Sequence, residues 1–139
     1  MIPVRNAELL RKATLFIPTG PVDHLHVVMN DAVFWPEVNY ESVLVVNFCS
    51  IKAGVPHDAT CELDKGAHRF ITHPTFVDYR HAGVLNATKL LTGIANGELR
   101  AADPISDALY ERILQGFATS PAVTPKLKRF IYFALKIRI

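Results

Sequence analysis

The pattern of hydrophobic and polar residues changes character along the chain. Residues 41–51 form the longest apolar run, and its β-branched residues are typical of a strand buried on both faces. Shorter β-type segments, separated by turn residues, lie on either side of it. The pattern predicts strands over residues 14–17, 24–30, 41–51, 59–63 and 75–81, with residues 67–72 as a further candidate.

Helical signals dominate the remaining third. Asp103-Pro104 is a helix start, and apolar side chains follow at four-residue steps from Ile105 to Phe117. Thr124-Pro125 repeats the start signal, and the last helix should bury Leu127, Phe130, Ile131 and Ala134. A short helix is also predicted over residues 6–12, with Asn6 as its candidate cap.

Closely spaced strands with no helices between them indicate a small barrel or one curled, mainly antiparallel sheet. We therefore expect an α+β fold. A chain of 139 residues fits one domain, since two cores would each be too small to fold comfortably. Its parts are a helical extension (1–13), a β-rich barrel (14–100) and a helical C-terminal part (101–139).

Composition narrows the class of protein. Half of the residues are hydrophobic and a fifth are charged, an ordinary balance for a globular domain. The apolar runs are far shorter than the roughly 20 residues of a membrane span, and the first 12 residues carry charges instead of an apolar leader. Two cysteines fit a reducing compartment better than a disulfide framework. We expect a cytoplasmic protein that does not associate with membranes.

Charge is distributed unevenly along the chain. Residues 1–111 contain nine Lys or Arg and all thirteen Asp or Glu, which gives −4. Residues 112–139 contain six cationic residues and no acid, which gives +6. Such a basic end can meet phosphate, an acidic partner segment or only solvent. Its candidate contacts for nucleic acid are Lys126, Lys128 and Arg129.

Motifs of high specificity are missing: the chain has no phosphate-binding glycine loop, dinucleotide fingerprint or zinc-protease pair. A zinc site would combine His24 and His26 with Cys49, Cys61 or His57, but the spacing is poor, and we expect no metal and no cofactor. Nucleophilic catalysis by Cys49 or Ser50 would need a base within hydrogen-bond reach, which spacing does not indicate.

Cleavage of RNA by its own 2′-hydroxyl asks less of a protein. It needs a base, an acid and a cation beside one phosphate, and histidine and arginine suit these roles. Taken singly, each histidine is more often a hydrogen-bonded structural residue. Residues of the required types are His24, His26, Ser50, His57, Arg69, His73 and Arg80.

Four stretches resemble the PemK/MazF family of toxin endoribonucleases: HLHVVMND (24–31), VLVVNFCSIK (43–52), HPTFVDYRHAGVL (73–85) and GELRAADPISDALYERILQGFATSP (97–121). The resemblance implies an SH3-like barrel that cuts single-stranded RNA without a metal. The family's catalytic Thr or Ser falls on Ser50. Its arginine falls on His24, which is a departure from the family pattern.

On this reading His24, His26, Ser50 and Arg69 are catalytic, while His57, His73, Arg80 and the basic end bind RNA. Aromatic residues that could stack bases are Trp35, Phe70, Phe76 and Tyr79, of which Phe70 and Phe76 are expected in the core. The resemblance also implies a homodimer and an antitoxin protein as partner. The alternative is a non-catalytic barrel module that binds an acidic protein or nucleic acid.

Overall fold

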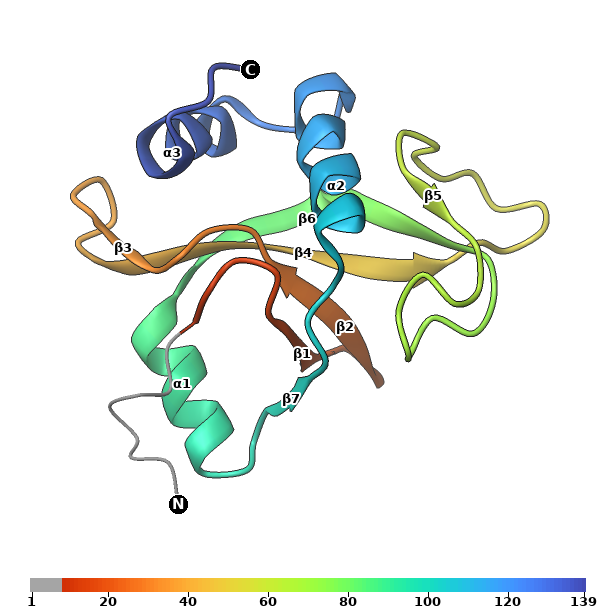
Figure 1. Cartoon of the computed structure of the whole chain (residues 1–139), viewed down its shortest axis with the longest axis horizontal. Helices are drawn as coiled ribbons and strands as arrows, with labels where there is room; N and C mark the ends of the chain where they lie inside the picture. Colours follow the sequence, from red (N-terminus) through yellow and green to blue (C-terminus); the bar gives the residue numbers. More distant parts are fainter. Residues whose placement is uncertain (1–8) are drawn as a thin grey trace.

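The structure is a computed structural model that describes residues 9–139. It is α+β, with one antiparallel sheet between helices (Figure 1). The strands are β1 (Thr14–Thr19), β2 (Val22–Val28), β3 (Val33–Trp35), β4 (Tyr40–Ser50), β5 (Glu62–Leu63), β6 (Thr75–Asn86) and β7 (Arg100–Ala102). The helices are α1 (Ala87–Ala95), α2 (Asp107–Thr119) and α3 (Pro125–Leu135).

The strands lie in the order β5-β6-β4-β2-β1-β7, and β3 pairs with the beginning of β4. Every pairing is antiparallel, which confirms the predicted sheet type. Among the described residues, the outer strands β5 and β7 do not pair with each other. The sheet is therefore open and is not closed into the predicted barrel.

Strand β4 separates two hydrophobic cores, because its successive side chains point to opposite faces of the sheet. Leu44 and Val46 pack toward α2 and α3, whereas Val43 and Val45 pack toward α1. Figure 1 shows α2 and α3 on one side of the sheet and α1 on the other. Residues 42–48 are all buried, as the apolar run predicts.

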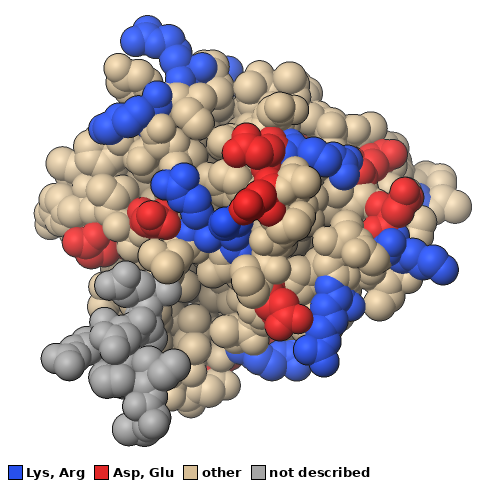
Figure 2. Space-filling view, viewed as in Figure 1, with Lys and Arg blue, Asp and Glu red and all other residues tan. Residues whose placement is uncertain are grey.

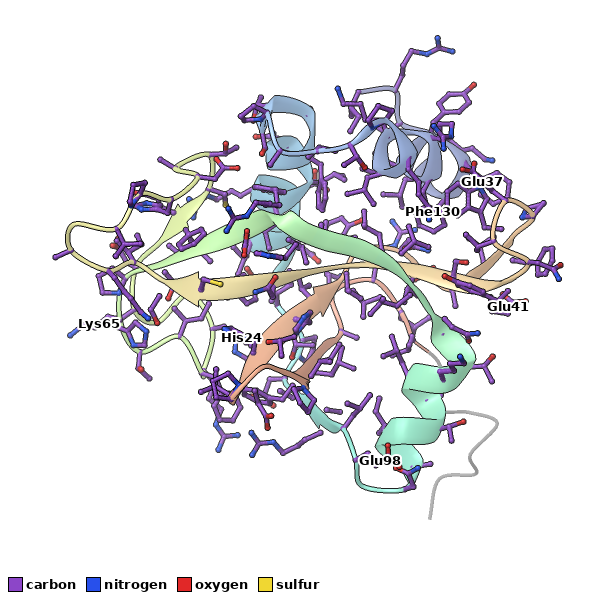
Figure 3. The ribbon with its side chains drawn as sticks, turned by 180° about the vertical axis from the view of Figure 1, so that it is seen from behind. His24, Glu37, Glu41, Lys65, Glu98 and Phe130 are labelled. Atoms are coloured by element: carbon purple, nitrogen blue, oxygen red, sulfur yellow. The ribbon has the colours of Figure 1, made fainter. Side chains whose placement is uncertain are left out.

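Side-chain hydrogen bonds cap the N-termini of α2 and α3. Thr124 accepts a hydrogen bond from the Leu127 N–H at 3.3 Å, so α3 begins as predicted. Ser106, and not Asp103, caps α2, because its Oγ accepts the Leu109 N–H at 3.1 Å. The predicted burial in α3 is confirmed for Leu127, Phe130 and Ile131, while Ala134 is half-buried; Phe130 lies beneath α3 in Figure 3.

Several sequence predictions are wrong or lie outside the described residues. Residues 67–72 form turns, because backbone bonds join Gly66 to Ile71 and Ile71 to His68. Only Glu62 and Leu63 of the segment 59–63 are extended. Residues 9–12 are not helical, and the rest of the predicted helix 6–12, including Asn6, lies outside the described range. Helix α1 and the short strands β3 and β7 were not predicted.

A large bulge interrupts the ladder between β4 and β6. Val45 pairs with Gly83 and Asn47 pairs with Asp78, so two steps along β4 correspond to five along β6. The extra residues of β6 leave the ladder here, and such bulges redirect side chains. Tyr79 turns into the core beneath α2, where it is fully buried and its hydroxyl donates to the Ile113 carbonyl at 2.8 Å.

Candidate functional site

A wide groove of about 920 Å³ lies where β2 begins, β4 ends and β6 begins. Five of the six histidines line it: His24, His26, His57, His73 and His81. We call this surface the histidine groove. Antiparallel pairing brings these strand ends together, although they are up to about fifty residues apart in sequence; Figure 3 shows His24 on β2 near the end of β4.

Three polar side chains form a row across the floor of the histidine groove. His26 of β2 pairs with Asn47 of β4, which pairs with Asp78 of β6, so all three point to the same face. Each of the three residues is only 6% exposed. The Asn47 carboxamide oxygen is the one buried side-chain oxygen or nitrogen in residues 9–139 without a hydrogen-bond partner. Helix α1 covers the apolar part of this face and leaves the row open.

His26 is held in one tautomer. Its Nδ1 lies 2.8 Å from the His24 carbonyl oxygen, and since a carbonyl can only accept, Nδ1 carries the proton. Burial lowers the pKa of His26 below its ordinary value of 6.5. The ring is therefore neutral at pH 7, with the lone pair on Nε2. No described residue bonds to Nε2, and this atom is not among the fully buried ones, so solvent reaches it.

Asp78 and His81 form a second oriented pair. The Asp78 side chain is 8% exposed, and its carboxylate accepts a hydrogen bond from Nδ1 of His81 at 2.5 Å. His81 lines the groove, its side chain is 61% exposed, and no described residue forms a hydrogen bond with its Nε2, so this atom is available to a ligand. A buried carboxylate behind an imidazole fixes the ring and stabilises the imidazolium form when a proton arrives.

Cys49 supports this pair and is unsuited to nucleophilic attack. Its thiol donates to Asp78 across 3.7 Å and lies 3.3 Å from the Asn47 amide nitrogen. Burial and the neighbouring Asp78 carboxylate raise the pKa of Cys49 to about 11. The thiolate, which is the reactive form, is scarce at neutral pH.

Ser50 and His73 form a separate pair at the rim of the histidine groove. Ser50 Oγ lies 2.6 Å from His73 Nε2, and both residues are exposed. Alternation along β4 places Ser50 on the face opposite Cys49 and the His26 row. The groove passes around the end of β4, so it includes both faces at this point.

The other predicted site residues divide between the groove and the surface outside it. Arg80 and Lys52 line the groove and supply cations. His57 also lines it, donates from Nε2 to Glu62 at 2.5 Å and packs against the Phe76 ring at 4.8 Å. Arg69 is not among the described lining residues, and its guanidinium lies 3.7 Å from the Asp103 carboxylate.

The predicted contacts Lys126, Lys128 and Arg129 lie on α3 and do not line the histidine groove. Lys126 and Lys128 are exposed on α3, and Arg129 makes two hydrogen bonds, at 2.6 and 3.2 Å, to the Glu37 carboxylate. This contact lowers the pKa of Glu37. In Figure 2, Lys and Arg side chains are spread over one face with Asp and Glu between them. The charge asymmetry of the sequence therefore does not produce one basic patch on that face.

Residues 9–139 contain neither a cluster of metal-binding side chains nor a helix that could span a membrane. Histidine, cysteine and acidic side chains do not gather in groups of three with the geometry of a metal site. The helices in this range are too short or too polar to cross a membrane.

Sequence reasoning missed Asn47, Asp78 and His81 as members of the site. In a regular strand, residues three apart point to opposite faces, so Asp78 and His81 would not meet. The bulge in β6 brings them together, and Gly83, where the ladder resumes, is the residue in the sequence that could have indicated it. His24, His26 and Val28 alternate along the predicted strand 24–30 and therefore share one face, and this spacing is the signal that could have led to Asn47 opposite His26.

Comparisons with known proteins add no assignment. No protein-family model matches the chain. Searches among curated proteins and among solved structures also gave no match.

Proposed function

We propose that this protein cleaves single-stranded RNA by metal-independent phosphodiester transfer, as the sequence resemblance to PemK/MazF toxins implies. The observation that carries the proposal is the convergence of two oriented imidazoles, His26 and His81, with Arg80 in one groove. These are the base, acid and cation that the reaction needs around one phosphate.

The reaction would use the nucleotide's own 2′-hydroxyl as nucleophile. His26 Nε2, neutral at pH 7, takes the 2′-hydroxyl proton as the 2′-oxygen bonds to phosphorus. The bond from phosphorus to the 5′-oxygen breaks, and protonated His81 gives its Nε2 proton to that oxygen. The products are a 2′,3′-cyclic phosphate and a 5′-hydroxyl. Asp78 keeps His81 oriented during both proton transfers.

Cations at the groove would stabilise the charge on phosphate. Arg80 follows Asp78 in the bulge, so it lies on the strand segment that also carries His81. A guanidinium can bind two phosphate oxygens at once, and this geometry adds specificity to charge. Lys52 and the Ser50–His73 pair would bind the flanking nucleotide, which moves the centre of the reaction from Ser50 to His26 and His81.

The same resemblance carries the finer proposals on fold and partners. The open antiparallel sheet would be a variant of the family's SH3-like barrel, in which β5 and β7 fail to meet. A homodimer and an acidic antitoxin remain proposals, with the exposed Lys126 and Lys128 of α3 as candidate contacts for the antitoxin. These two residues also support the alternative of a non-catalytic binding module in the cytoplasm.

The test compares two oligonucleotides of one mixed sequence in the presence of a chelator. One is single-stranded RNA and the other is its fully 2′-O-methylated form, which lacks the nucleophile. We expect cleavage of the RNA alone, with fragments that end in a 2′,3′-cyclic phosphate by mass spectrometry. Cleavage of both oligonucleotides would contradict the 2′-hydroxyl mechanism. Intact RNA after incubation with folded protein would favour the binding module.

A further inference from the structure

Phe70 is an exposed aromatic residue at the rim of the histidine groove. The sequence predicts it in the core, together with Phe76, but 44% of its surface is accessible. The other two candidate stacking residues, Trp35 and Tyr79, are in the core instead, at 4% and 0% exposure. Phe70 is therefore the candidate most open to a ligand, and exposed aromatic surface beside a polar groove often marks a binding site.

The position of Phe70 is fixed by groups behind it. Its backbone N–H donates to Nδ1 of His68 at 3.1 Å, and the other nitrogen of His68 donates to the Asp103 carbonyl at 2.5 Å. His68 is buried and lies outside the groove lining, so its role is to hold this loop. Phe16 and Phe70 form a T-shaped aromatic pair, with ring centres 5.1 Å apart and planes at 83°.

Two arginines flank this aromatic pair. Arg100 lies 4.2 Å from the ring centre of Phe16 and 6.0 Å from that of Phe70, and Arg69 lies 5.5 Å from the Phe70 ring. Asp103 partly neutralises Arg69 across 3.7 Å. Arg100 makes no ion pair with any residue that the structure describes, so it is available to an anionic group.

We propose that Phe70, Phe16, Arg69 and Arg100 form a nucleobase-stacking subsite for single-stranded RNA beside the histidine groove; this deepens, and rests on, the proposed function. A planar base stacks on an aromatic ring or on a guanidinium plane whatever its sequence. Arg69 and Arg100 lie over the Phe70 and Phe16 rings, so they extend the stacking surface and also supply charge for the neighbouring phosphates. A fixed, partly open ring loses little entropy when a base stacks on it. An acidic peptide would use the arginines but would gain little from the flat Phe70 ring.

The experiment uses the full chain and a 2′-O-methyl oligonucleotide that carries one 2-aminopurine. This probe cannot be cleaved through its 2′-position, and its fluorescence falls when the base stacks. Phe70→Ala should weaken binding roughly tenfold by fluorescence anisotropy and should abolish the quenching. Phe70→Trp should retain both. The matched control is Phe34→Ala, because Phe34 is 45% exposed on β3 and should change neither signal.

The outcomes separate this proposal from the proposed function. Equal binding and quenching by Phe70→Ala and wild type would overturn the subsite, even if wild type cleaves RNA. Absence of binding by wild type, or displacement of the probe by polyglutamate at the concentration at which RNA displaces it, would also overturn it. Quenching that depends on Phe70, in a protein that cleaves no RNA, would support the subsite and contradict the nuclease.

Discussion

Gly116 should be intolerant of alanine, although it lies inside helix α2. Alanine normally stabilises a helix interior by about 1 kcal/mol relative to glycine. Here, a Cβ at position 116 would lie 1.7 Å from the Tyr79 hydroxyl oxygen and 2.4 Å from the ring carbon that bears it. Both distances are far below van der Waals contact, so Gly116→Ala forces the Tyr79 ring or α2 to move.

The size of the effect follows from the contacts of Tyr79. Movement breaks the buried hydrogen bond to the Ile113 carbonyl and disturbs the edge contact with Phe117, whose ring centre lies 4.8 Å away. An unsatisfied buried polar group costs about 1–3 kcal/mol, and overpacking adds about 1–3 kcal/mol. After the helix propensity of alanine is subtracted, we expect a net loss of about 1–5 kcal/mol in the free energy of unfolding.

Urea denaturation of wild type, Gly116→Ala and Gly83→Ala measures this loss. Gly83 is the matched control, because a Cβ there meets no atom within 4 Å and its φ is not positive. Gly83→Ala should change the free energy of unfolding by less than about 1 kcal/mol. If Gly116→Ala is equally harmless, α2 does not approach β6 as closely as this packing requires. The bulge that carries Arg80 and His81 would then lack its anchor in Tyr79.

Two more predictions concern groups in the histidine groove. Burial lowers the pKa of His26, so near pH 6.5 the unfolded chain binds a proton that the folded chain does not bind. Wild type should therefore lose stability relative to His26→Gln as the pH falls below 6.5. A stability difference by urea denaturation that stays constant with pH would contradict this prediction. The pKa of Cys49 is raised from 9.0 to about 11, so at pH 8 this thiol should react with a thiol reagent roughly a hundredfold more slowly than a free cysteine. The measurement uses the Cys61→Ala variant, in which Cys49 is the one remaining cysteine. Reaction at the rate of a free cysteine would refute the buried environment of Cys49.

The fold could be predicted where local pattern and burial agree. The continuous apolar run of β4 is buried because the sheet has a core on each face. The apolar side chains at four-residue steps form the buried face of α2, and Thr124 caps α3 as the sequence predicts. Helix α1 was missed because β6 runs directly into it. Asn86 is both the last residue of β6 and the N-cap of α1, so no turn residues separate the strand from the helix. Local pattern does not separate two elements that meet without a break.

The candidate site could be predicted only in part, because tertiary contacts select its members. Five of the six histidines line one groove, but a bulge adds Asp78 to the site and orients His81, and strand alternation turns Ser50 to the other face. Residues 67–72 have β propensity, yet the bonds of His68 fold them into turns that expose Phe70. Propensity describes a segment alone, and these outcomes depend on partners that are distant in sequence.

In the proposed reaction, His26 and His81 are the base and the acid that cleave RNA. The single-turnover rate of cleavage of a fluorescent single-stranded RNA, in chelator, tests this assignment with wild type, His26→Gln, His81→Gln and Glu111→Gln. Glu111 is exposed on α2, outside the groove, and serves as the control. We predict that each histidine variant, folded by circular dichroism, loses roughly a hundredfold or more in rate while the control keeps the wild-type rate. Cleavage at the wild-type rate by both histidine variants, or none by wild type, would contradict the claim.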